Sequence, residues 1–303
     1  MGAYDQAARF AAQVDPDAVV RRVLQPALAP LQFREWLDTR TIPLPGGPDR
    51  IADLVAALED AETLQPALLI LEFQSRHDPD KLDVTLEEAG ILRGHVRHGP
   101  NRDGKYRVLT ALVYLQGRCP DDVLDMTLAH GFGTRHRALV WNVADDDAAD
   151  ALDAVANGMA SWGVLFWVAL MGGGGDDTVI ARWRDVVAQV VPLPRMRGNM
   201  AGIALVFAEL VGRRPAWVRG LEGFEMTESQ VVNEWIGQGM VKGELAASRR
   251  NLLELLNGRF PGAVPSDVTR LIQQQDSLEL LNDWFRAAVR AFSFDQFLEV
   301  LKK

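Results

Sequence analysis

Apolar residues near the amino terminus recur with the period of a helix, and Pro26 and Pro30 then interrupt that pattern. Asp17 lies within it and can accept hydrogen bonds from the free N–H groups at a helix start. The apolar positions are Phe10, Val14, Val19, Val23 and Leu24. Residues 41–48 contain three prolines and two glycines, which predicts an irregular connection.

Three later runs have the composition of β-strands. Residues 67–75 form a mainly apolar run bounded by Pro66 and by Arg-His-Asp-Pro, the pattern of a buried strand. Residues 106–115 and 137–143 are rich in branched and aromatic side chains. A regular element that begins near residue 50 precedes the first run across a short polar loop, so these two segments predict an antiparallel hairpin.

The order of elements indicates an α/β fold. Helical spacing over residues 81–96 separates the hairpin from the later strands, which gives the order helix, strand, strand, helix, strand, strand. This order predicts a central mixed sheet flanked by helices in a domain over residues 1–145. After residue 146 no strand pattern follows, and we expect a helical extension over 146–240 and a helical module over 241–303.

The composition is that of a globular chain without unusual features. Of the 303 residues, 48% are hydrophobic and 24% are charged, which excludes a disordered or collagen-like chain. The single cysteine, Cys119, cannot form an intrachain disulfide, and this suits a reducing, cytoplasmic location. The longest apolar stretch, 163–171, is shorter than the roughly 20 residues that cross a bilayer, so it predicts a buried helix and no membrane partner.

The most informative polar residues are Asp53, Glu72 and Gln74. Alternation along a strand places Glu72 and Gln74 on one face and Phe73 on the other. Residues 67–71 are all apolar, and a carboxylate buried among them is costly unless a cation or a hydrogen-bond network compensates. In an antiparallel hairpin Asp53 comes alongside Glu72, and two carboxylates form an oxygen-rich site suited to Mg²⁺.

Such a site could activate water against a phosphodiester and stabilise the charge that develops on the phosphate. Taken singly, Asp53 or Glu72 could instead be a solvated or salt-bridged edge residue at a strand end. We also expect that removing one carboxylate relieves repulsion, so that stability without Mg²⁺ stays level or rises.

These residues carry a resemblance to a known family. The segment from Pro43 to Leu92 resembles the recombination-promoting nuclease and putative transposase family of the PD-(D/E)XK nuclease superfamily, through Pro-Asp-Arg-Ile-Ala-Asp53 and Leu-Leu-Ile-Leu-Glu72-Phe-Gln74. The final helices, through Trp284 and Phe297, are similar to the C-terminal helical module often attached to these proteins. The resemblance covers residues 1–145 and 225–303, and the middle helices match only loosely.

The resemblance implies a restriction-endonuclease-like fold and a role for each site residue. Asp53 matches the metal-binding aspartate, Glu72 the acidic residue of the second motif, and Gln74 the position that is lysine in most of the superfamily and often glutamine in this branch. An amide cannot act as a general acid or base as lysine can, so catalysis would rely on the metal while Gln74 orients water or a phosphate oxygen.

The formal charge of −9 opposes tight DNA binding overall, because phosphate affinity depends on Lys and Arg. A local group of basic residues could still contact a phosphate backbone, and the alternative is an ordinary solvated helix end and loop. The expected DNA-binding residues are Arg93, Arg97, Lys105 and Arg107.

The sequence therefore leads to two functional hypotheses. The first is a Mg²⁺-dependent DNA endonuclease, a hydrolase linked to recombination or a mobile element. The second is a catalytically inactive nuclease-fold protein that acts as a protein-interaction or DNA-associated scaffold. In either case the C-terminal helices could mediate contact with a second copy or with a protein partner.

Overall fold

The computed structural model describes residues 3–24, 28, 30–37, 52–98, 106–224, 248–260, 264–275, 277–291 and 293–301. The irregular connection expected at 41–48 and Lys105 lie outside these residues. The chain forms two compact units, Met1–Ser229 and Gln230–Lys303. The predicted domain 1–145 and residues 146–224 of the predicted extension 146–240 thus share the first unit, because helices that follow residue 145 pack on the amino-terminal helices.

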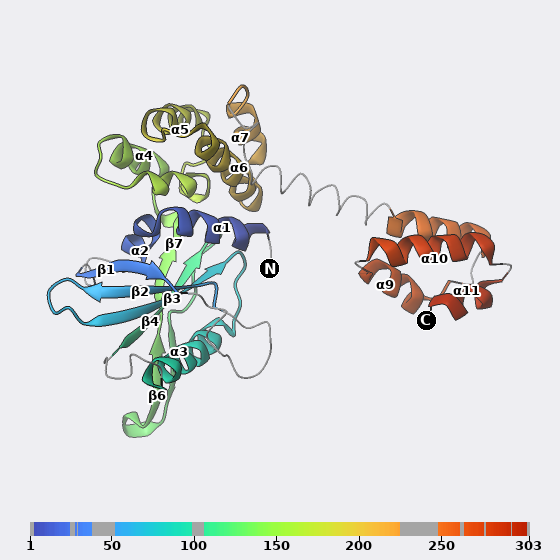
Figure 1. The fold of residues 1–303 in the computed structure, drawn as a ribbon, viewed down its shortest axis with the longest axis horizontal. Coiled ribbons are helices and arrows are strands. Elements are labelled where there is room, and N and C mark those ends of the chain that lie inside the picture. The colour runs from blue at the N-terminus through green and yellow to red at the C-terminus, as the bar shows by residue number, and fades with distance from the viewer. Residues whose placement is uncertain are drawn as a thin grey trace. The chain divides into compact units, whose positions relative to one another are not determined.

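A five-stranded mixed sheet in the order β1-β2-β3-β4-β7 forms the centre of the first unit (Figure 1). The pairs β1–β2 and β2–β3 are antiparallel, whereas β3–β4 and β4–β7 are parallel. The five strands are β1 (Leu31–Trp36), β2 (Leu54–Asp60), β3 (Pro66–Gln74), β4 (Arg107–Tyr114) and β7 (Leu139–Asn142). The predicted mixed α/β class is confirmed. Strand β1 is not predicted by the sequence pattern.

Helices cover both faces of this sheet (Figure 1). Helices α1 (Ala3–Val14) and α2 (Pro16–Leu24) lie on one face, and α3 (Lys81–His98) lies on the other, between β3 and β4 in the chain. Side chains alternate between the two faces along β3, so this strand contributes to the packing on both sides of the sheet. Ile70 packs in the cluster that includes Leu92 of α3, while Phe73 stacks on Trp167 with ring centroids 6.1 Å apart.

The second half of this unit is helical. Its α-helices are α4 (Ala148–Ala156), α5 (Asp177–Val190), α6 (Pro194–Leu210) and α7 (Arg214–Gly220). The apolar stretch 163–171 is buried as predicted, but it forms two 3₁₀ turns, Trp162–Phe166 and Val168–Leu170, instead of one α-helix. Side chains from later in the chain donate hydrogen bonds to carbonyl groups of this stretch. Trp183 Nε1 donates to Leu165 O at 2.9 Å, and Arg213 donates to Ala169 O at 2.9 Å.

The second unit is helical throughout its described residues. Residues 248–259 form a helix, followed by α9 (Ser266–Gln274), α10 (Leu278–Arg290) and α11 (Phe294–Leu301). Leu252, Leu256, Leu281 and Trp284 lie in its core as their spacing indicates. Within the described ranges of the whole chain, none of the helices combines the length and apolar character that a bilayer crossing requires.

Candidate active site

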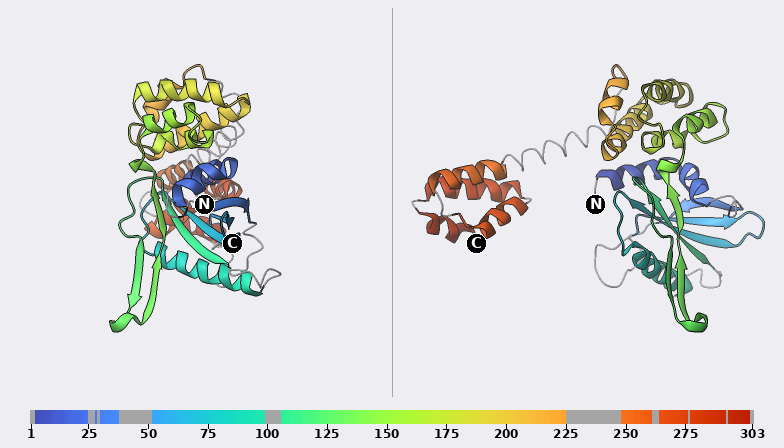
Figure 2. Two further views of the ribbon diagram at one scale, coloured as in Figure 1. Left: turned by 90° about the vertical axis from the view of Figure 1, so that its left-hand side faces the viewer. Right: turned by 180° about the vertical axis from the view of Figure 1, so that it is seen from behind.

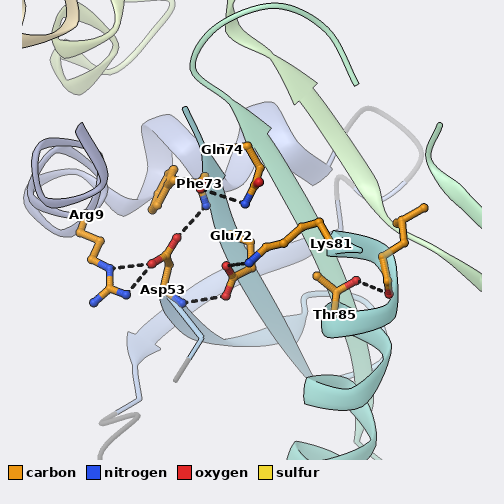
Figure 3. A network of polar contacts seen from close by, with 8 residues as sticks. Arg9, Asp53, Glu72, Phe73, Gln74, Lys81 and Thr85 are labelled. Atoms are coloured by element: carbon orange, nitrogen blue, oxygen red, sulfur yellow. Dashed lines mark hydrogen bonds and ion pairs between the residues drawn. The ribbon is translucent and has the colours of Figure 1, made fainter. Parts of the chain in front are cut away.

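Asp53 and Glu72 lie side by side because of the register between β2 and β3. Leu54 pairs with Leu71, which places Asp53, the residue before β2, opposite Glu72. The backbone N–H of Asp53 donates to Glu72 Oε1 at 2.9 Å, and the N–H of Phe73 donates to Asp53 Oδ2 at 2.8 Å (Figure 3). Each strand therefore fixes the carboxylate of the other with its backbone.

A cation from a flanking helix meets each of these carboxylates. Arg9 of α1 donates through Nε to Asp53 Oδ1 at 3.0 Å, and a second guanidinium nitrogen contacts the same oxygen. Lys81, the first residue of α3, places Nζ 2.5 Å from Glu72 Oε2. All four carboxylate oxygens thus have a partner (Figure 3).

The sequence reasoning missed both of these cations. A signal for Lys81 was present, because a buried carboxylate in an apolar strand requires a compensating cation, and Lys81 opens the next helix. A lysine is unfavourable at a helix amino terminus, where the macrodipole favours anions, so its placement there indicates a specific partner. For Arg9 we find no comparable signal.

The ionisation of the Glu72–Lys81 pair follows from burial and from mutual attraction. Burial raises the pKa of Glu72, and the nearby charge of Asp53 adds to this, while Lys81 opposes both. Burial lowers the pKa of Lys81, but the charge of Glu72 and its hydrogen bond outweigh burial and leave that pKa raised. Lys81 is therefore held as an ammonium against Glu72.

Glu88 is a third acidic group at this site that the sequence reasoning missed. Lys81, Thr85 and Glu88 share one face of α3, at spacings of four and three residues, and that face points toward the sheet. Glu88 is only 7% exposed, and its Oε2 has no hydrogen-bond partner among the described residues. Burial, together with the charge of Glu72, raises the pKa of Glu88 to about 8.

Gln74 lies at the same end of the sheet, but its amide is hydrogen-bonded to the backbone of the preceding residue. It lies two residues beyond Glu72 on the same face of β3 and is buried. Its Nε2 donates to the carbonyl of Phe73 at 3.0 Å, which leaves Oε1 as the acceptor that it can offer (Figure 3). The structure thus brings Asp53, Glu72 and Gln74 to one region.

The ion pairs reverse the expectation about stability. Repulsion between Asp53 and Glu72 alone would make removal of one carboxylate neutral or favourable. With Arg9 and Lys81 in place, removal of one acid leaves a partly buried cation without its counter-charge, which destabilises the folded state.

The expected DNA-binding residues fall into two groups. Arg93 and Arg97 are exposed on α3, and neither forms an ion pair within the described residues. Arg107 begins β4 and pairs with Asp60 at 3.2 Å, so one of the expected phosphate contacts is already partly neutralised. Lys105 lies outside the described residues.

Asp53 and Glu72 suit a Mg²⁺ ion only if water and substrate supply the remaining ligands. In the described part of the chain, no group of three or more Asp, Glu, His or Cys side chains is arranged to hold a metal ion. Mg²⁺ often takes one or two carboxylates and completes its coordination with water and substrate phosphate. Asp53 and Glu72 can supply that pair of hard oxygen ligands if the metal replaces part of the contacts with Arg9 and Lys81.

Comparison of the chain with protein-family models, with curated proteins and with solved structures finds no match. The resemblance to recombination-promoting nucleases therefore stays a prediction from residues 43–92.

Proposed function

We propose that this protein is a divalent-metal-dependent nuclease that hydrolyses phosphodiester bonds in DNA at Asp53 and Glu72, within a fold of the PD-(D/E)XK type. One observation carries the proposal: two adjacent carboxylates and the ammonium of Lys81 meet at the end of the β2–β3 pair. These are the groups that metal-assisted phosphodiester hydrolysis requires. The link to recombination or a mobile element is part of the same proposal and derives from the resemblance.

Each residue has a role that follows from its chemistry. Asp53 and Glu72 would hold Mg²⁺, which supplies Lewis-acid stabilisation of the phosphate and lowers the pKa of a water molecule. Lys81 supplies the positive charge that Gln74 lacks, because its ammonium can turn from Glu72 toward a phosphate oxygen. The Oε1 atom of Gln74 can accept a hydrogen bond from the attacking water.

The inactive-scaffold hypothesis has its own support in the structure. Every oxygen of Asp53 and Glu72 is already satisfied by Arg9, by Lys81 or by a backbone N–H. A closed network of this kind is also what a purely structural ion-pair cluster looks like. Activity measurements separate the two hypotheses.

Incubation of the full chain with supercoiled plasmid tests the proposal directly. We expect nicked and linear DNA with Mg²⁺ or Mn²⁺ and intact plasmid with EDTA. A chain that is folded by circular dichroism, shows no cleavage with either metal and gains no thermal stability from them would be the inactive scaffold.

The exposed arginines of α3 give a prediction about DNA binding. Simultaneous Arg93→Ala and Arg97→Ala substitutions should weaken binding to duplex DNA and lower the slope of log Kd against log salt by about 2, because each phosphate contact contributes about 0.9. Fluorescence anisotropy at several salt concentrations measures this slope. Arg21→Ala, at an exposed arginine of α2, is the matched control. An unchanged slope in the double variant would assign Arg93 and Arg97 to ordinary surface.

A further inference from the structure

The second, two-stranded sheet extends away from the rest of the first unit (Figures 1 and 2). It consists of β5 (Val123–Thr127) and β6 (Gly133–Arg137), an antiparallel pair in the register Val123↔Arg137 to Thr127↔Gly133. We call residues 123–137 the arm. No sequence pattern predicted it, because exposed strands of this length lack an apolar alternation.

The arm ends in a fixed turn that displays two large apolar side chains. The N–H of Leu128 donates to Phe132 O at 2.5 Å, and Gly131 donates to Leu128 O at 3.2 Å. Gly133 has a φ of +135°, and a Cβ there would lie 2.3 Å from Met126 O, so only glycine fits. Leu128 is 76% exposed and Phe132 is 72% exposed, so the turn presents two large apolar side chains to solvent.

The base of the arm is attached to the helix that carries Lys81. His136 Nε2 lies 3.1 Å from Thr85 Oγ1 and 3.2 Å from Thr110 Oγ1. Thr85 Oγ1 also donates to Leu82 O at 3.0 Å, so this threonine links the arm to the first turn of α3. Because Thr85 is one turn after Lys81, the arm begins beside the candidate active site.

Each arginine of the arm pairs with an acid, and one of these acids, Asp122, directly precedes the arm. Arg137 pairs with Asp122 at 2.8 Å, and Arg135 approaches Asp125 at 3.8 Å. The arm therefore offers little net attraction for phosphates, while its tip exposes the apolar side chains of Leu128 and Phe132. Charge complementarity to a nucleic acid is supplied by the same helix that holds the arm, where Arg93 and Arg97 are exposed.

We propose that the arm is a wedge that enters duplex DNA bound at the candidate active site, with Leu128 and Phe132 inserted at a base step some distance from the bond to be cut. The inference rests on the proposed nuclease function and extends it to the substrate class. Insertion of apolar side chains costs a few kcal/mol of unstacking, and the cost is least where a base is already unpaired. The preferred substrate is thus DNA with a mismatch, a bulge or another weakened step.

Anisotropy titrations of the full chain in EDTA with two labelled duplexes test the wedge. The duplexes share one sequence, and one carries a single-base bulge. We expect the wild type to bind the bulged duplex about tenfold more tightly, a difference of about 1.4 kcal/mol. Leu128→Ser with Phe132→Ser should abolish this preference and leave the salt slope unchanged, since neither residue contacts phosphate. Met159→Ser, at a side chain that is 75% exposed outside the arm, is the matched control.

Several outcomes would overturn the wedge. One is equal affinity of the wild type for both duplexes, and another is a preference that survives in the double variant. Light scattering that shows the double variant to be monomeric and the wild type dimeric, with an unchanged preference, would assign the arm to contacts between copies. Plasmid cleavage together with equal affinity for the two duplexes refutes only the wedge, whereas absence of both DNA binding and cleavage refutes the proposed function as well.

Discussion

Glu72→Gln should reduce magnesium-dependent cleavage of plasmid DNA by about 1,000-fold or more, which corresponds to about 4 kcal/mol of transition-state stabilisation. The amide keeps the size of the side chain and can still accept a hydrogen bond from the N–H of Asp53. It cannot provide an anionic ligand to a metal, and it removes the counter-charge that holds Lys81 in the site. Initial rates of nicking at saturating Mg²⁺ measure the effect.

The same substitution should also lower the stability of the fold, so a second variant is needed to distinguish unfolding from loss of catalytic activity. Glu72→Gln leaves Lys81 largely buried and unpaired, which we expect to lower the free energy of unfolding by about 2 kcal/mol or more. Adding Lys81→Met removes the unpaired charge and should recover most of that stability. Activity should remain absent in this double variant, because the metal ligand is still missing.

Glu62→Gln serves as the control for the charge change. Glu62 lies in the exposed turn between β2 and β3, away from the carboxylate pair. Its substitution should leave both cleavage and stability unchanged. Cleavage by Glu72→Gln at the wild-type rate would show that cleavage does not depend on the Glu72 carboxylate.

The sequence was informative where neighbouring segments pair directly. The contact between Asp53 and Glu72 follows from a hairpin with a short loop, whose length restricts the register. The alternation of Glu72, Phe73 and Gln74 between faces is likewise local. Both features depend on residues within about one hairpin of each other, and for this reason they could be predicted.

The remaining parts of the site depend on how helices pack on the sheet. Arg9 is 44 residues from Asp53 in the chain, and its partner is decided by where α1 crosses the sheet. In the sequence, nothing distinguishes Glu88 from the other acidic residues of its helix. Only the packing of α3 on β3 shows that Glu88 is buried beside Glu72. Such charge pairs leave no periodic pattern in the sequence, which is why the prediction included the acids of the hairpin and none of their partners.

The buried carboxyl group of Glu88 should make stability depend on pH. Its pKa is about 8 in the folded chain against 4.5 as the ordinary value, so between these pH values the folded state holds a proton that the unfolded state has released. The stability contribution is complete below pH 4.5, falls as pH rises, and is lost above about pH 8. The pKa difference corresponds to about 5 kcal/mol, of which entry of water on ionisation should relieve a part.

Glu88→Gln removes this titration while keeping the shape and a hydrogen-bond donor. We expect the variant to match the wild type near pH 5 and to exceed it by about 2–4 kcal/mol at pH 9, because only the wild type must then ionise a buried acid. Urea denaturation at pH 5, 7 and 9 measures the difference. Glu87→Gln, at the exposed neighbouring glutamate of α3, is the control and should show no such trend. Parallel pH profiles for Glu88→Gln and the wild type would mean that Glu88 ionises as freely as a surface glutamate, and the packing of α3 against Glu72 would then be wrong.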